Sequence, residues 1–191
     1  MTSGTAARPM LERRRARHQA LHILYQKEIT GKPASEILAE GTWDVRPLDV
    51  EDREESFSIG EPPEFMFSIL EGVDAHSEEI DATIERLSQH WVLSRMPLVD
   101  RNILRIAVYE LLFEPDIPSS VTINEAVEMA KVYAGEDSSK FVNGILGKLA
   151  DETEDASVAC EREAAEPVEE FVATPLDTDL TAIETPEGDE A

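Results

Sequence analysis

The chain has little of the chemistry that carries disulfides, redox sites or membrane spans. Its 191 residues include a single cysteine, Cys160, which has no partner for an internal disulfide and no histidine nearby for a metal. No apolar run approaches the roughly 20 residues that a membrane helix needs. The arginines near the N-terminus lead into an amphipathic segment and not into the apolar core of a signal peptide. These absences predict a cytoplasmic protein with no membrane partner.

Positive charge is also scarce, but it is concentrated in one segment. The chain holds 17 Lys and Arg against 41 Asp and Glu, a net charge of −24, which argues against binding to nucleic-acid phosphates. Residues 151–191 supply −14 of that charge, with 15 acidic residues against Arg162 alone. Between Arg8 and Lys27, six basic residues stand against the single acid Glu12. The sequence therefore predicts a basic patch on an otherwise acidic protein.

The spacing of the apolar residues predicts an all-α fold, a compact bundle of about seven helices without strands. The expected helices span about 10–28, 34–40, 77–91, 98–113, 122–134 and 137–150, and one more begins at Glu64 and is followed closely by the next. Apolar residues cover most of the circumference of the segment 98–113, so we expect this helix to be central. Residues 1–9 are expected to be flexible.

Several residues have the positions of helix caps. Thr122 and Glu125 have the spacing of a capping box, and Gly135 is suited to end the same helix. Ser77 is suited to cap the fourth helix, and Asp137 or Ser138 the last one. These signals set the expected helix boundaries.

The packed domain is predicted to span residues 10–150, with one loop inside it and a tail after it. Residues 41–63 mix prolines with acids without helical periodicity and are interpreted as an acidic loop. Residues 151–191 contain one aromatic residue, Phe171, and many Glu, Ala, Thr and Pro. Such a composition buries too little apolar area to offset the entropy of ordering, so we expect a disordered acidic tail.

The first helix carries a candidate nucleic-acid surface. Arg14, His18, Leu21 and Tyr25 recur at helical spacing along one stripe, and the pair Arg13 and Arg17 lies on the adjacent row. Guanidinium groups pair with phosphates and a tyrosine ring stacks on an unpaired base, which is how single-stranded RNA is bound. The alternative is that the arginines form a solvated helix end and Tyr25 packs in the core.

The turn before the last helix is a second candidate. Backbone amides at a helix N-terminus can bind a phosphate together with Ser138, Ser139 and Lys140, and Phe141 is either a core residue or a stacking surface. Asp137 complicates this interpretation, because as a cap it would occupy the same amides and add negative charge. Both alternatives stay open from the residues alone.

Enzymatic arrangements are absent from the sequence. Gly31-Lys32 lacks the upstream glycine of a phosphate-binding loop, and no His-Glu pair has the spacing of a zinc protease. The many carboxylates have the pattern of solvated helix faces. We therefore expect no catalytic residue, no metal and no cofactor.

Three segments together resemble the NusB family. They are RRRARHQALHILYQ at 13–26, VDRNILRIAVYELLF at 99–113 and INEAVEMAKVYAGEDSSKFVNGIL at 123–146. The resemblance implies an all-α fold of two small helical subdomains. It also implies transcription antitermination through binding of boxA RNA in ribosomal RNA leader transcripts, together with NusE, the ribosomal small-subunit protein ten. NusA, NusG and RNA polymerase would complete the assembly.

The resemblance also assigns roles to individual residues. Arg13, Arg14 and Arg17 match the RNA-contacting basic motif, and Tyr25 matches its aromatic residue. In the first turns of the last helix, Asp137 and Phe141 match positions at the RNA-binding edge, with Lys140 beside them, and Asp100 matches a position of NusE contact. The acidic loop and tail depart from shorter family members.

Two other functions stay open. NusB-like domains also occur fused to ribosomal RNA methyltransferases, so the chain could be an accessory unit of such an enzyme. It could also be a structural partner module that forms homodimers through the same helices.

Overall fold

The computed structural model describes residues 4–41, 43, 62–88 and 91–164. Within these residues it contains seven α-helices, one 3-10 turn and no strand, which confirms the all-α prediction. The elements are α1 (Gly4–Thr30), α2 (Ala34–Ala39), α3 (Glu64–Ala75), α4 (Ser77–Leu87), η1 (Leu93–Arg95), α5 (Leu98–Phe113), α6 (Ser119–Tyr133) and α7 (Glu136–Ala164).

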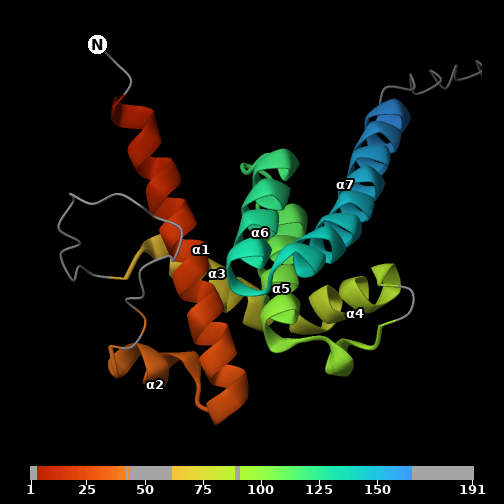
Figure 1. Ribbon diagram of the computed structural model, residues 1–191. Helices are drawn as coiled ribbons and strands as arrows, with labels where there is room; N and C mark the ends of the chain where they lie inside the picture. Colours follow the sequence, from red (N-terminus) through yellow and green to blue (C-terminus); the bar gives the residue numbers. More distant parts are fainter. Residues whose placement is uncertain (1–3, 42, 44–61, 89–90, 165–191) are drawn as a thin grey trace, which may run out of the picture.

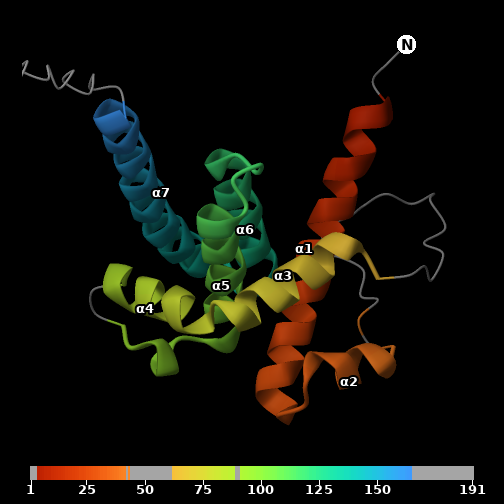
Figure 2. The same ribbon diagram turned by 180° about the vertical axis from the view of Figure 1, so that it is seen from behind.

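The helices form two groups that share α5. Helix α1 packs against α2 and α3, while α4, α6 and α7 surround α5, which also contacts α1 and α3 (Figure 1). The prediction that the fifth helix is central is confirmed, because its buried residues include Ile103, Leu104, Ile106 and Val108. Seen from behind, α3 crosses between α1 and α5 (Figure 2).

One hydrophobic core runs through both groups. The predicted apolar face of α1 is confirmed, since Ala16, Ala20, Leu21, Ile23 and Leu24 are all buried in it. The remaining helices contribute mainly branched aliphatic side chains, among them Ile37, Ile69, Ile80, Ile84, Ile145 and Leu146. Burial of these side chains supplies the main favourable free energy of folding.

Helices α3 and α5 approach each other closely where Gly72 faces the ring of Tyr109. A Cβ atom at Gly72 would lie 2.0 Å from Cε2 of Tyr109, so only glycine allows this packing. The Tyr109 hydroxyl donates to Glu114 Oε1 over 2.8 Å and thereby fixes the ring. The contact was not predicted, because nothing local in the sequence pairs these two positions.

The outer ends of the first and last helices differ from the predictions. Helix α1 begins at Gly4 and not at about Met10, because Ala6 and Ala7 favour helix and extend it through Pro9, although Pro9 removes one backbone hydrogen bond. Helix α7 continues to Ala164 and not to Ala150, because residues 151–164 contain neither Gly nor Pro and are rich in Ala and Glu. Both ends extend away from the body (Figure 1).

The predicted acidic loop and tail fall largely on residues 42, 44–61 and 165–191, outside the described residues. Trp43, within the predicted loop, is 7% exposed and belongs to the core. Trp43 is a turn residue, as the loop prediction expects, but its indole ring packs among apolar side chains and not in water.

The cap predictions are correct for glycine and wrong for the side chains. Gly135, at φ +95°, follows α6 as expected, and a left-handed backbone at this position favours glycine. Helix α6 begins at Ser119, three residues before the predicted cap Thr122, because Pro118 fixes the backbone at its entry. Ser77 and Asp137 are already helical residues and do not cap their helices.

Candidate RNA-binding surface

The three arginines of the basic motif lie in three different environments on α1. Arg13 is exposed, and its guanidinium carbon lies 5.3 Å from the ring centroid of Phe65 on α3. The side chain of Arg14 is 31% exposed and that of Arg17 only 4%. The same Phe65 ring lies 5.4 Å from the guanidinium carbon of Arg17, so one aromatic ring contacts a solvent-facing and a buried arginine.

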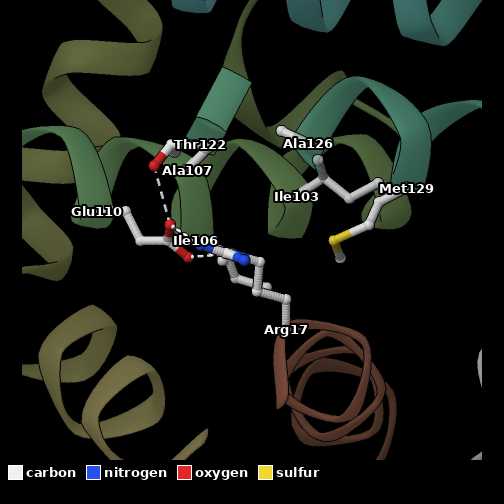
Figure 3. Close-up of a pocket in the computed structure, with 8 residues that line it drawn as sticks. All are labelled: Arg17, Ile103, Ile106, Ala107, Glu110, Thr122, Ala126 and Met129. Atoms are coloured by element: carbon white, nitrogen blue, oxygen red, sulfur yellow. Dashed lines mark hydrogen bonds and ion pairs between the residues drawn. The ribbon is translucent and has the colours of Figure 1, made fainter. Parts of the chain in front are cut away.

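Arg17 forms a buried forked ion pair with Glu110 of α5. Its Nε and Nη2 each donate to one carboxylate oxygen over 2.7 Å, and the hydroxyl of Thr122 on α6 donates to Glu110 Oε2 over 3.0 Å (Figure 3). Three helices are thereby joined through one carboxylate. For Arg17 to bind RNA this pair would have to open, so its role as an RNA ligand stays a prediction.

A small cavity lies beside this pair (Figure 3). Its volume is about 10 Å³, and apolar side chains such as Ile103, Ile106 and Met129 form most of its wall. A space of this size holds one water molecule at most. The cavity is therefore no binding site for a small-molecule substrate.

The predicted stripe along α1 is divided between the surface and the interior. Arg14 and Tyr25 are partly exposed, Tyr25 to 37%, whereas His18 and Leu21 are buried. The burial arises from α6, where the Tyr133 hydroxyl lies 2.9 Å from Nδ1 of His18. Helical spacing correctly placed the residues on one side of α1, but α6 covers the middle of that side.

His22 completes the contact between α1 and α6. Its ring meets the edge of Tyr133 at a centroid distance of 5.6 Å and an interplanar angle of 83°. Partial burial disfavours the charged imidazolium and lowers the pKa of His22 below its ordinary value. We call this contact between α1 and α6 the α1–α6 seam. His22 and Tyr133 were not predicted to belong to it, and the only signal in the sequence was the recurrence of histidine four residues after His18.

Ion pairs orient the C-terminal half of α1, which carries Tyr25. Arg105 of α5 forks onto Asp81 of α4 with two contacts of 2.7 Å and also reaches Glu28 of α1 at 2.5 Å. Arg101 pairs with the same Glu28 carboxylate. These pairs fix the position of α1 relative to α4 and α5.

The first two turns of α7 carry the other predicted residues. The side chain of Asp137 is fully exposed and lies 3.7 Å from Nζ of Lys140, which is 74% exposed. Phe141 is half-buried, with its ring centroid 5.8 Å from that of the exposed Trp91. Gly135 connects this turn directly to α6, so the α1–α6 seam and the α7 turn are neighbours.

Asp100, the predicted partner contact, is 4% exposed at the start of α5. Its Oδ2 accepts a hydrogen bond from the Ser138 hydroxyl of α7 over 3.1 Å, while Oδ1 is buried without a hydrogen bond. Burial raises the pKa of Asp100, and the hydrogen bond from Ser138 opposes that shift. In this structure Asp100 positions the first turn of α7, and its contact with a partner protein stays a prediction.

Among the described residues, no three His, Cys, Asp or Glu side chains lie together in a way that could hold a metal ion. None of the described helices is both long and apolar enough to span a membrane.

The fold and the basic helix define a class, that of small all-helical proteins with an arginine-rich first helix. The NusB family model matches residues 14–151, and the chain belongs to this family. It is 44% identical over 142 residues to the transcription antitermination protein NusB of Desulfitobacterium hafniense, covering 74% of this chain and 89% of the relative. It is 42% identical over 147 residues to that of Heliobacterium modesticaldum, covering 76% of this chain and 66% of the relative.

A solved structure has the same fold. The crystal structure of the antitermination factors NusB and NusE in complex with double-stranded RNA contains a chain that is 28% identical to this one, with a TM-score of 0.60. The match covers 75% of this chain and 98% of that one. The family, first suggested by three sequence segments, is thereby confirmed.

Two acidic residues beside the arginines were not assigned to the site by the sequence. Glu110 is the one acid in the largely apolar stretch 103–113, and that isolation is a signal of a buried ion pair. Glu125 was interpreted as half of a capping box, but its carboxylate faces Arg14 and Arg17 at 3.8 Å and 4.0 Å. Both corrections follow from contacts between α1 and distant segments.

Proposed function

We propose that this NusB-family chain acts in transcription antitermination by binding boxA RNA of ribosomal RNA leader transcripts. The observation that carries the proposal is the continuity of α1, α6 and the first turn of α7. Arg14 reaches Glu125 of α6, Tyr133 of α6 reaches His18, and Gly135 leads on to Lys140 and Phe141. Charged and aromatic side chains thus follow one another along a single edge.

Each side chain of this edge has a distinct task in the proposal. Arg13, Arg14 and Lys140 contact phosphates, because their charged groups are the solvent-accessible cations of the edge. Tyr25 and Phe141 stack on unpaired bases through the exposed parts of their rings. Asp137 opposes phosphate binding by its charge and thereby limits nonspecific affinity.

Arg17 contributes from the interior. Its pair with Glu110 orients α1 on α5 and α6, so the neighbouring Arg13 and Arg14 face the solvent in a fixed register. The proposal retains a direct phosphate contact of Arg17 as a second role, which would require the ion pair to open. No chemical reaction is proposed for any of these residues.

The protein partner in the proposal is NusE, since a relative forms a complex with NusE and RNA. The chain would join an antitermination complex with RNA polymerase, NusA and NusG in the cytoplasm. Asp100 supports the NusE-binding side through the Ser138 hydrogen bond, which holds the start of α7 against α5. NusE comes from that relative, and the other partners come from the family resemblance, so each requires its own binding measurement.

Fluorescence anisotropy tests the proposal with a labelled boxA RNA and a scrambled RNA of equal length, each with and without NusE. We expect a preference for boxA that increases when NusE is present. The Arg13→Ala, Arg14→Ala double variant should bind more weakly, and its salt slope should fall by about 1.4, because each phosphate contact to a single strand contributes about 0.7. Equal binding of both RNAs, unaffected by NusE, would reject the proposal.

A further inference from the structure

The carboxylate of Glu125 lies between the two arginines of the α1–α6 seam. Its Oε2 is 3.8 Å from Nε of Arg14 and 4.0 Å from Nη1 of Arg17, and the side chain is 16% exposed. The same oxygen is buried and accepts no hydrogen bond. A charged acceptor that is close to two cations and yet accepts no hydrogen bond is under-satisfied.

The two arginines near Glu125 differ in how far other carboxylates compensate their charge. Arg17 already donates two hydrogen bonds of 2.7 Å to Glu110, so its charge is largely compensated there. Arg14, with 31% of its side chain exposed, is the cation that both Glu125 and the solvent can reach. A phosphate that approached Arg14 from the solvent would therefore meet a guanidinium that already faces an internal carboxylate.

We propose that Glu125 is an internal competitor of the RNA phosphate at Arg14 and is an affinity-determining residue of the RNA-binding edge. This inference rests on the proposed function for its ligand. The Nε of Arg14 that faces Glu125 is buried, so a phosphate binds the other guanidinium nitrogens from the solvent side through charge-assisted hydrogen bonds, and the guanidinium charge is then shared between phosphate and carboxylate. The carboxylate then stays close to the bound phosphate and repels it. The protein thus binds RNA more weakly than its arginines alone would allow.

The test compares two substitutions on α6 that change the net charge equally. Glu125→Gln keeps the shape of the side chain and removes its charge. Glu128→Gln, the control, lies one turn further on and removes the charge of an exposed carboxylate that pairs with Lys131 at 2.6 Å. Binding is measured by fluorescence anisotropy with a boxA RNA and a scrambled RNA, and thermal unfolding is recorded for every variant to verify folding.

We expect Glu125→Gln to raise the affinity for both RNAs about fivefold, equivalent to about 1 kcal/mol, beyond any change in Glu128→Gln. The salt slope should stay unchanged, since the number of phosphate contacts is the same. In an Arg14→Ala background the gain from Glu125→Gln should disappear, because the cation for which the carboxylate competes is missing.

Two results would overturn the inference. Equal affinities of Glu125→Gln and Glu128→Gln would mean that only net charge matters, and a weaker Glu125→Gln would mean that the carboxylate positions Arg14 for RNA. The proposed function fails separately. If Glu125→Gln binds both RNAs more tightly but neither protein prefers boxA, the competition by Glu125 is supported and boxA as the ligand is rejected. If boxA is preferred but Glu125→Gln gains no affinity, boxA binding is supported and the competition is rejected.

Discussion

Arg17 of α1 and Glu110 of α5 are 93 residues apart in the chain and form a buried ion pair with two contacts of 2.7 Å. The Thr122 hydroxyl adds a third hydrogen bond to the carboxylate. The pair joins the two groups of helices at the level of the basic motif. One arginine of a motif suited to RNA phosphates therefore has a structural role in this fold.

Loss of either partner of this pair should destabilise the protein strongly. We expect Arg17→Met or Glu110→Leu alone to cost about 3–5 kcal/mol of the free energy of unfolding, because each leaves a buried charge without its partner. The double variant Arg17→Met, Glu110→Leu should recover most of that loss, since two apolar side chains of similar volume need no compensation. Urea denaturation measures all three variants.

The matched control for that series is Arg86→Met, which breaks the exposed pair of Arg86 with Glu152. Its urea midpoint should stay close to that of the parent protein, because exposed pairs contribute little. If Arg17→Met shifted the midpoint as little as Arg86→Met, the structural role of Arg17 would be wrong.

Asp137→Asn should increase the affinity for RNA by a few fold at low salt. The exposed carboxylate lies 3.7 Å from Nζ of Lys140 and both partly neutralises that cation and repels a phosphate. The gain should shrink as salt rises, because exposed charges are screened. Asp151→Asn, an equal change of charge on the exposed face of the same helix, is the control in anisotropy titrations, and an equal gain from it would contradict the prediction.

Gly72→Ala should destabilise the fold by about 1–3 kcal/mol, because overpacking a close contact forces neighbouring elements apart. The added Cβ would lie 2.0 Å from Cε2 and 2.1 Å from Cζ of Tyr109. Gly147→Ala on α7, where no atom lies within 4 Å of the new Cβ, should instead stabilise by up to about 1 kcal/mol through helix propensity. Thermal unfolding of both variants checks the opposite signs, and equal shifts would contradict the close α3–α5 packing.

Protonation of His22 should reduce stability in mild acid. Burial lowers its pKa in the folded state below the ordinary histidine value of about 6.5, so the unfolded chain binds more protons between the two pKa values. The contribution of neutral His22 is therefore complete above about pH 6.5 and is lost as the pH falls through the lowered pKa. His22→Gln, which cannot titrate, should lose less stability over this interval in urea denaturation. Parallel losses in the two proteins would contradict the shift.

Local patterns in the sequence predicted most of the fold. The apolar spacing placed α2 and α5 within a residue of their observed bounds and α3 at its observed start, and Gly135 marked the end of α6. The outer ends of α1 and α7 were missed because helix propensity alone, without an apolar stripe, extends both helices. Thr122 was taken for a cap because its acceptor, Glu110, lies in another helix.

The candidate site was predictable as a set of residue types but not as a surface. Helical spacing placed Arg14 and Tyr25 on one side of α1, yet it could not reveal that Tyr133 covers His18 between them. Whether an arginine is buried depends on a distant carboxylate, as Arg17 and Glu110 illustrate. Contacts between helices far apart in the sequence decide which charges remain accessible to RNA.

Photo-cross-linking tests the central claim most directly. A boxA RNA that carries 4-thiouridine at successive positions is bound to the full chain with NusE, irradiated and mapped by mass spectrometry. The account predicts cross-links on residues 11–27 of α1 and residues 136–148 of α7. Cross-links confined to α2, α3, α4 or α5 would contradict an RNA-binding edge formed by α1, α6 and α7.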